Sequence, residues 1–198
     1  GTAQLHGVLI GLDKTLSASF MFRDYDREFQ NNYSNSFAES KTQNEKGFYS
    51  GVEFKPNLNW KFRSYIDLYQ YPWLRHSSNT PTIGTDFFIQ SDYKINRNTK
   101  IYFIYKNEKK EENTNIEYDN SPIIEIQKKE GWRFNSIFKE GENWTFKNRI
   151  EISKVQKNSV TENGFMFYQD VKYKPLFSKL SFSVRYTFFN TESYNSRI

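Results

Sequence analysis

The sequence predicts an all-β protein, specifically an antiparallel up-and-down transmembrane β-barrel of about ten strands. Three observations lead to this fold class. Segments of about ten residues alternate apolar and polar side chains, which is the period of a strand rather than a helix. Tight connections and long polar loops join these segments in turn, as in outer-membrane barrels. Finally, a low mean hydropathy of −0.84 accompanies 19 Phe, 14 Tyr and 4 Trp.

A two-faced β structure explains this composition, because one face can be aromatic while the other is charged. Disordered chains, by contrast, are poor in aromatic residues. The 198 residues contain no stretch that resembles an interdomain linker, so we expect a single β-barrel domain over 1–198, or a fragment of one. No apolar run approaches about 18 residues, which excludes a transmembrane helix. The absence of Cys excludes a disulfide framework.

In the first half of the chain, period-two alternation predicts strands near 5–10, 16–23, 48–55, 60–69 and 86–95. After the short first segment, each places apolar residues on one face and polar residues on the other. The apolar positions are Leu16, Ala18, Phe20 and Phe22, then Phe48, Val52 and Phe54, then Trp60, Phe62, Ile66 and Leu68, then Phe87, Ile89, Tyr93 and Ile95.

The second half repeats the pattern and predicts strands near 99–109, 132–139, 144–153, 165–173 and 180–188. The polar positions again fall on a single face. The apolar positions are Ile101, Phe103 and Tyr105, then Trp132, Phe134 and Phe138, then Trp144, Phe146, Ile150 and Ile152, then Phe165, Phe167, Val171 and Tyr173, then Leu180, Phe182, Val184, Tyr186 and Phe188.

The connections between these segments alternate in length. Outer-membrane barrels have long extracellular loops and short periplasmic turns, whereas a soluble meander has no reason to collect its long loops at one end. The expected tight connections are 11–14, 56–58, 96–98, 140–143 and 174–178. The expected long loops are 26–45, 72–83, 110–129 and 157–163.

Alternation does not say which face lies outside, so a soluble lipocalin-like ligand-binding β-barrel with inward aromatic residues is the alternative. The membrane interpretation is favoured because large aromatic residues gather at the ends of the expected strands. Amphipathic rings prefer the two headgroup levels of a bilayer. The expected girdle consists of Trp60, Tyr93, Trp144 and Tyr173 beside tight turns, with Trp73 and Trp132 toward the long loops.

The face opposite the aromatic one mixes acidic and basic residues along each strand. Such residues can pair across neighbouring strands in a water-filled lumen, where they would set any solute selectivity. The expected lumen-lining residues are Arg23, Glu53, Arg63, Asp67, Asp92, Lys100, Arg133, Arg149, Glu151, Asp170 and Arg185.

No constellation for catalysis or metal binding stands out, so we expect neither enzyme activity nor a cofactor. The two histidines, His6 and His76, are far apart and form no ligand pair at metal spacing. His76 with Ser77 or Ser78 matches no nucleophile motif. Acidic residues of the third long loop lack the spacing of a calcium loop. These residues are Glu111, Glu112 and Glu117.

Binding to nucleic acid is not favoured either, because the net charge is only +5 and basic residues alternate with acids on one face. The segment Asp24–Lys46 is the best candidate for a specific surface, since it is rich in Asn, Ser, Tyr and Phe. That composition suits contact with a glycan or a protein. It equally suits a loop that folds inward as a plug, or one that packs its own rings against the rim.

Several stretches of the chain resemble a known family. They are Phe22–Phe29, Asn44–Phe48, Tyr71–Leu74, Tyr168–Tyr173 and Tyr194–Ile198. They are similar to the barrel portion of Bacteroidetes outer-membrane β-barrel proteins that are often labelled helix-hairpin-helix or competence-protein-like. The helical region behind that label has no counterpart here, so the resemblance implies no DNA-binding residues.

The resemblance has two further implications. Family members continue beyond the position of Ile198 with further strands, so it implies that this chain is part of a larger barrel. The chain also starts directly with a strand-like stretch, which for an exported protein indicates a mature chain or a fragment. We therefore expect a porin-like, non-enzymatic protein of the bacterial outer membrane. Its surroundings would be the lipid bilayer, its candidate partners other envelope proteins, and its role that of a channel or of a structural, partner-binding component of an envelope complex.

Overall fold

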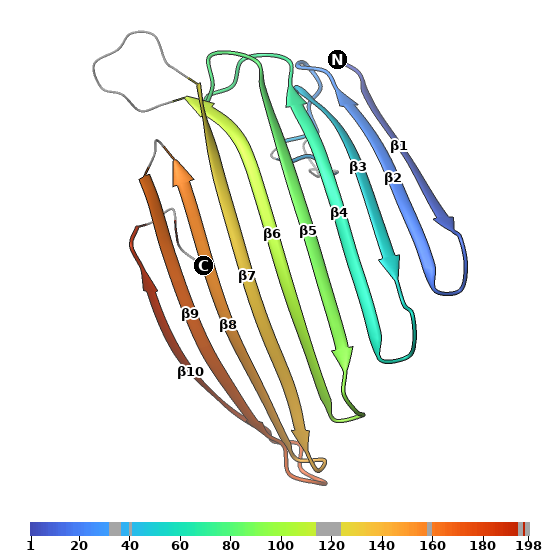
Figure 1. Cartoon of the computed structure of the whole chain (residues 1–198), viewed down its shortest axis with the longest axis vertical. Helices are drawn as coiled ribbons and strands as arrows, with labels where there is room; N and C mark the ends of the chain where they lie inside the picture. The colour runs from blue at the N-terminus through green and yellow to red at the C-terminus, as the bar shows by residue number, and fades with distance from the viewer. Residues whose placement is uncertain (32–36, 40, 114–123, 158–159, 194–195, 197–198) are drawn as a thin grey trace.

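The computed structural model describes residues 1–31, 37–39, 41–113, 124–157, 160–193 and 196. Within this part of the chain, ten strands form one antiparallel sheet in sequence order, which confirms the predicted up-and-down arrangement (Figure 1). Glu117 and most of the stretch Tyr194–Ile198 lie outside the described residues. The strands are β1 (Ala3–Gly11), β2 (Leu16–Tyr25), β3 (Glu45–Phe54), β4 (Trp60–Tyr71), β5 (Thr82–Lys94), β6 (Thr99–Asn113), β7 (Ile124–Glu140), β8 (Trp144–Lys157), β9 (Val160–Tyr173) and β10 (Phe182–Thr191).

The short connections lie together at one end of the sheet, at the bottom of Figure 1. Asparagine side chains shape two of them by accepting backbone hydrogen bonds, as is common in turns. Asn57 accepts from the amides of Asn59 and Trp60 at 2.9 and 3.0 Å. In the turn before β6, the Asn96 side chain accepts hydrogen bonds from the backbone amides of Asn98 and Thr99, both at 2.8 Å. Gly141 supplies the left-handed backbone (φ 58°) in the turn between β7 and β8.

Two of the four expected long loops are shorter than predicted. β6 continues to Asn113 and β7 begins at Ile124, so much of the predicted loop 110–129 is strand. Likewise β8 reaches Lys157 and β9 begins at Val160, which leaves little of the predicted loop 157–163. Polar side chains support these extensions across strands, an effect that apolar periodicity does not detect. Glu130 accepts hydrogen bonds from the Tyr105 hydroxyl and from Asn107 at 3.0 and 3.1 Å.

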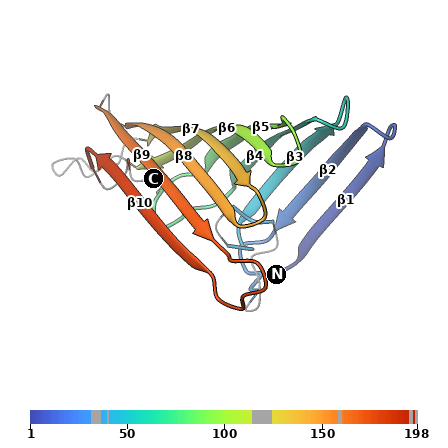
Figure 2. The same cartoon turned by 90° about the horizontal axis from the view of Figure 1, so that it is seen from below.

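The ten strands curve into an open trough, seen from below in Figure 2. We call the inner side of the trough, which carries Arg23, Arg63 and Arg133, the concave face. The opposite side, which carries Phe22, Phe62 and Phe134, is the convex face. Register keeps the two sets apart across neighbouring strands, because directly paired residues point to the same side of a sheet.

The sheet does not close on itself. Among the described strands, β1 pairs only with β2 and β10 pairs only with β9. Both edge strands are exposed along nearly their whole length. A closed barrel is therefore not present in this structure, although its up-and-down strand order is.

Candidate functional site

The concave face gathers all the residues predicted to line a lumen. Strand register places every one of them on this side, from Arg23 on β2 to Arg185 on β10. Most are paired with a residue of opposite charge on a neighbouring strand. The candidate functional site is therefore a polar surface shared by nine strands rather than a compact catalytic centre.

Ion pairs cross the concave face in rows. Asp92 on β5 lies between Arg63 on β4, at 3.1 Å, and Lys100 on β6, at 3.0 Å. Arg133 and Glu151 form a two-pronged pair with both hydrogen bonds at 2.7 Å. The basic side chains of these pairs are partly exposed, whereas Asp92 is buried. Because water screens the basic groups, each pair should contribute about 1 kcal/mol or less to stability. Their main effect is to make the face polar and wettable.

The same arrangement recurs at the β10 edge. Arg185 donates two hydrogen bonds to Asp170, at 2.5 and 2.8 Å. Arg149 and Arg185 both lie over the ring of Tyr168, with guanidinium carbons 4.9 and 4.6 Å from its centroid. Cation–π contacts of this kind hold the two arginines over the strand surface.

One ionic cluster is largely buried. Sequence periodicity predicted Arg23 and Asp67 for this face but not Glu45. Arg23 (1% exposed) bonds Glu45 (0% exposed) at 2.5 Å and Asp67 at 2.8 Å. Gly47 is needed beside it, because a Cβ at that position would lie 2.3 Å from the guanidinium carbon of Arg23. Glu45 also accepts from the backbone amide of Glu39 at 3.0 and 3.1 Å. The cluster therefore ties part of the loop 26–44 to the concave face.

A second contact joins two loops at the end of the sheet opposite the tight turns. The Asn44 side chain donates to the Trp73 carbonyl and accepts from the Trp73 amide, both at 2.9 Å. The guanidinium of Arg27 lies 4.9 Å from the centroid of the Trp73 ring. Trp73, predicted for the aromatic girdle, thus lies in the loop after β4 and links it to the loop 26–44. In the described residues of the segment Asp24–Lys46, these contacts are made between neighbouring loops, and the choice between a plug and a rim-packed loop stays open.

Glu39 meets several charged groups of the concave face from its place in the loop 26–44. Although the Glu39 residue is exposed overall, surrounding protein atoms partly desolvate its carboxyl group and raise its pKa to about 7. The carboxylates of Glu108 and Asp86 add to the increase, whereas the ammonium of Lys106 opposes it. A carboxyl group that titrates near neutrality therefore sits where the loop meets strands β5 and β6.

The convex face carries the remaining predicted girdle residues in pairs. At the level of the tight turns, Trp60 lies 4.3 Å from Tyr93, and Trp144 lies 4.4 Å from Tyr173, measured between ring centroids. Toward the other end, Trp132 lies 5.7 Å from Tyr105. Trp60, Tyr93, Trp144 and Tyr173 therefore lie at the tight-turn ends of their strands, on the face opposite the charges. Trp132 and Tyr105 lie near the middle of β7 and β6, because both strands extend beyond their predicted ends.

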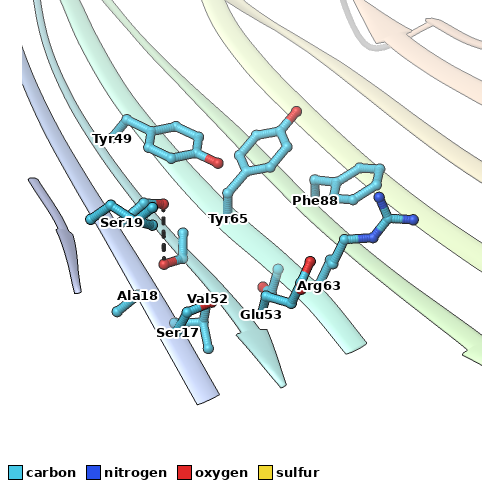
Figure 3. Close-up of a pocket in the computed structure, with 12 residues that line it drawn as sticks. Ser17, Ala18, Ser19, Tyr49, Val52, Glu53, Arg63, Tyr65 and Phe88 are labelled. Carbon is cyan, nitrogen blue, oxygen red and sulfur yellow. Dashed lines mark hydrogen bonds between the residues drawn. The ribbon is translucent and has the colours of Figure 1, made fainter. Parts of the chain in front are cut away.

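A hollow of about 490 Å³ opens on the concave face toward the tight-turn end (Figure 3). The rings of Tyr49, Tyr65 and Phe88 form one wall, and Glu53 and Arg63 lie at another side. Sequence reasoning missed this aromatic group. Alternation had already placed these three rings on the charged face, which was the available signal.

The two histidines that were considered for catalysis or metal binding lie far apart in the structure. His6 lies on β1 opposite Phe22, and His76 is exposed in the loop after β4. No group of His, Cys, Asp and Glu in the described residues has the geometry to hold a metal ion. The described residues also include no helix that is long and apolar enough to cross a membrane.

The chain matches no protein-family model, and no curated protein resembles it at a significant level. The resemblance to Bacteroidetes outer-membrane proteins therefore stays a prediction.

Proposed function

We propose that this chain forms part of the wall of a bacterial outer-membrane β-barrel. Its convex face contacts lipid, its concave face lines the lumen, and it acts without enzymatic activity as a channel or as a structural, partner-binding component of the envelope. The observation that carries the proposal is the distribution of apolar side chains over the two faces of the sheet.

Large apolar side chains are exposed on the convex face of nearly every strand. Phe20, Ile66, Phe103, Phe134 and Ile150 are all among them. The buried hydrophobic residues of the described chain are few: Ala18, Tyr25, Tyr69, Tyr71 and Val155. A soluble barrel of the lipocalin type would place its aromatic residues inside, away from water. An exposed apolar band around a polar interior instead supports a lipid-facing wall.

The height of this band suits a bilayer. On β8, the outward side chains from Trp144 to Ile152 are apolar except for Asn148, whose side-chain amide donates to the Ser136 hydroxyl at 3.2 Å, and they span about 26 Å at about 3.3 Å per residue. A strand tilt of about 40° lowers the height to about 20 Å, near the apolar band of about 25 Å found in such barrels. Beyond Trp132, the convex face of β7 becomes polar at Glu130 and Lys128, as expected where a strand leaves the membrane.

The open edges support the idea that this sheet is part of a larger barrel. An unpaired backbone group in lipid costs several kcal/mol, so a membrane sheet has no free edge. We therefore propose that further antiparallel strands pair with β1 and β10. Amide hydrogen exchange of the detergent-solubilised protein tests this pairing. Amides of β1 and β10 should then be as protected as those of β5, and rapid exchange along both edges would contradict closure.

The absence of Cys allows a sharp test of orientation and location. Leu58 lies in the turn between β3 and β4 and is 98% exposed, whereas Leu74 lies in the loop between β4 and β5 and is 50% exposed. Leu58→Cys and Leu74→Cys are each expressed in Gram-negative cells and treated with a membrane-impermeant maleimide.

We expect Leu74→Cys to be labelled on intact cells, and Leu58→Cys to be labelled only after the outer membrane is permeabilised. The protein should also fractionate with outer membranes and require detergent for release. Recovery as a soluble protein without detergent would overturn the proposal. Conductance in planar bilayers then separates the two roles, because a channel passes ions and a plugged structural barrel does not.

A further inference from the structure

The hollow on the concave face has features of a ligand site. It is lined by residues of strands β1 to β5 and lies on the wet side of the sheet (Figure 3). Its volume of about 490 Å³ falls within the range of about 300–1,000 Å³ that is typical of small-molecule sites. It contains both ring faces and polar groups, which is the combination that such sites use to bind and orient a ligand.

Small residues on two strands create the space. Ser17 and Ser19 on β2 and Gly51 on β3 line the hollow beneath the rings. A Cβ on Gly51 would lie 2.7 Å from the Tyr49 hydroxyl and 2.8 Å from the Ser19 Oγ, so only glycine leaves those groups in place. Gly51 therefore makes room for the Tyr49 side chain at the edge of the hollow.

Three aromatic rings from successive strands make a continuous wall. The centroids of Tyr49 and Tyr65 are 5.3 Å apart with planes tilted by 34°, and those of Tyr65 and Phe88 are 5.1 Å apart with planes at 11°. The Tyr65 hydroxyl donates to Asp86 at 3.2 Å, which holds this ring in position. Near-parallel rings at this spacing overlap, so Tyr65 and Phe88 cover part of each other's inner faces. The uncovered parts of the faces carry the negative side of the aromatic quadrupole and attract the weakly positive C–H groups of a ligand.

The polar side of the hollow is balanced in charge. Arg63 and Glu53 are the charged residues that line it. Arg63 is held by Asp92 at 3.1 Å, and Glu53 is held by Lys55 and Lys61 at 2.6 and 2.7 Å. Among the described residues, the buried Nε of Arg63 has no hydrogen-bond partner. The lining itself therefore carries one positive and one negative side chain, which offer guanidinium donors and carboxylate oxygens, while the ammonium groups of Lys55 and Lys61 lie behind Glu53 and outside the lining.

A second hollow provides a contrast within the same chain. It lies across β8, β9 and β10 and is lined by Lys147, Lys172 and Arg185 with Asp170 as the acid. That excess of positive charge suits an anionic ligand. The lining of the hollow of Tyr49, Tyr65 and Phe88 has no such excess. A ligand of the latter needs apolar C–H faces together with uncharged hydrogen-bonding groups on its rim.

We propose that the hollow binds a neutral carbohydrate, with one sugar ring packed against the uncovered parts of the rings of Tyr65 and Phe88 and with its hydroxyl groups bonded to Arg63 and Glu53. A pyranose ring presents C–H groups on its face and hydroxyl groups around its edge, which matches the two sides of the site. The inference concerns the concave face alone and does not depend on membrane insertion. Its failure can therefore be distinguished from failure of the proposed location.

The test uses the purified chain in a detergent without a sugar headgroup, such as lauryldimethylamine oxide, so that the detergent cannot occupy the site. Saturation-transfer NMR is recorded with maltose, cellobiose and xylobiose as neutral probes, and with glucuronate and inorganic phosphate as anionic ones. We expect transfer to the ring C–H protons of at least one neutral sugar, with a Kd on the order of 1 mM.

Three variants separate the site from the rest of the face. Tyr65→Leu removes the central ring and should weaken sugar binding by about tenfold or more, equivalent to about 1.4 kcal/mol. Tyr65→Phe keeps the ring and should bind nearly as the natural chain does. Tyr102→Leu is the matched control, because Tyr102 is a ring of the concave face on β6 outside the hollow. It should leave binding unchanged.

Circular dichroism of each variant establishes that the sheet is retained. The proposal is overturned by absence of saturation transfer to every neutral probe, by equal binding in Tyr65→Leu and the natural chain, or by an equal loss in Tyr102→Leu. Transfer to glucuronate alone would overturn it as well, because a site for anions cannot be the neutral hollow described above.

Discussion

Phe103 offers the most direct test of which face of the sheet meets lipid. It lies on β6 between Ile101 and Tyr105 on the convex face, pairs with Ser91 and Phe134, and is 43% exposed. Phe103→Arg places a charge in the middle of the apolar band. If the band contacts lipid, this guanidinium must leave water or distort the bilayer.

The structure allows the size of the effect to be estimated. Above Tyr105, the first polar residue on this face is Asn107, about 13 Å from Phe103 along the strand at about 3.3 Å per residue. An arginine at this depth cannot easily snorkel to the polar level. At the midplane of a barrel, such an arginine costs about 2–4 kcal/mol. We therefore expect Phe103→Arg to lower the free energy of unfolding by about that amount, or to prevent assembly.

Two variants serve as controls. Tyr102→Arg makes nearly the same change at the next residue, but on the concave face opposite Asp92, so its effect should stay below about 1 kcal/mol. Phe103→Leu keeps the convex face apolar and should be nearly neutral against lipid. In a packed soluble core, the same replacement would leave a costly void.

The assay is urea unfolding of each variant in lipid vesicles, together with the fraction that reaches the outer membrane in cells. Equal destabilisation by Phe103→Arg and Tyr102→Arg would refute the assignment of faces. A water-soluble chain that is strongly destabilised by Phe103→Leu would refute the membrane interpretation altogether.

Three further predictions follow from the concave face and its loops. Arg23→Met leaves the buried Glu45 and the half-buried Asp67 without their cation and should cost about 3–5 kcal/mol in urea unfolding, whereas a cost below about 1 kcal/mol would mean that the cluster is hydrated. Asn44→Ala removes both bonds to Trp73 and should speed limited proteolysis of the loop 26–44, and an unchanged cleavage rate would contradict that link. The folded-state pKa of Glu39 is raised to about 7, so its contribution to stability is largest below its ordinary pKa near 4.5 and is lost as the pH rises to about 7. Glu39→Gln should remove this pH dependence from melting curves measured between pH 4 and 8, and a persistent slope would assign it to other groups.

Much of the fold could be predicted from the sequence, because the alternation of apolar and polar residues within one strand is visible without knowledge of its neighbours. Phe20 and Phe22 share one side of β2 with Ala18, whatever the neighbouring strands are, since side chains of a strand alternate between faces. The same rule placed Arg63 and Asp67 together on the opposite side of β4. The pairing of strands joined by tight connections followed from those turns, because a short turn leaves only an antiparallel neighbour within reach. The pairing across the long loops followed from the expected up-and-down barrel, in which consecutive strands are neighbours.

Strand ends were harder to predict, because they depend on partners in other segments. The upper parts of β6 and β7 are polar, and their own periodicity resembles that of a loop. They remain strands because backbone pairs between 106–113 and 124–131 continue the ladder. Side-chain bonds such as the one from Lys157 to Glu112, at 3.3 Å, reinforce the extension across the sheet.

Chain-local pattern therefore determined the strands, their order and the separation of charged and apolar faces. Only the tertiary structure decided the burial of Arg23 with Glu45, the link between Asn44 and Trp73, and the stacking of Tyr49, Tyr65 and Phe88. These contacts join residues on different strands and loops, and their geometry depends on register and curvature. The open edges at β1 and β10 are also a tertiary result, because closure depends on the curvature of the whole sheet and on the partner that each edge finds, not on the pattern within any strand.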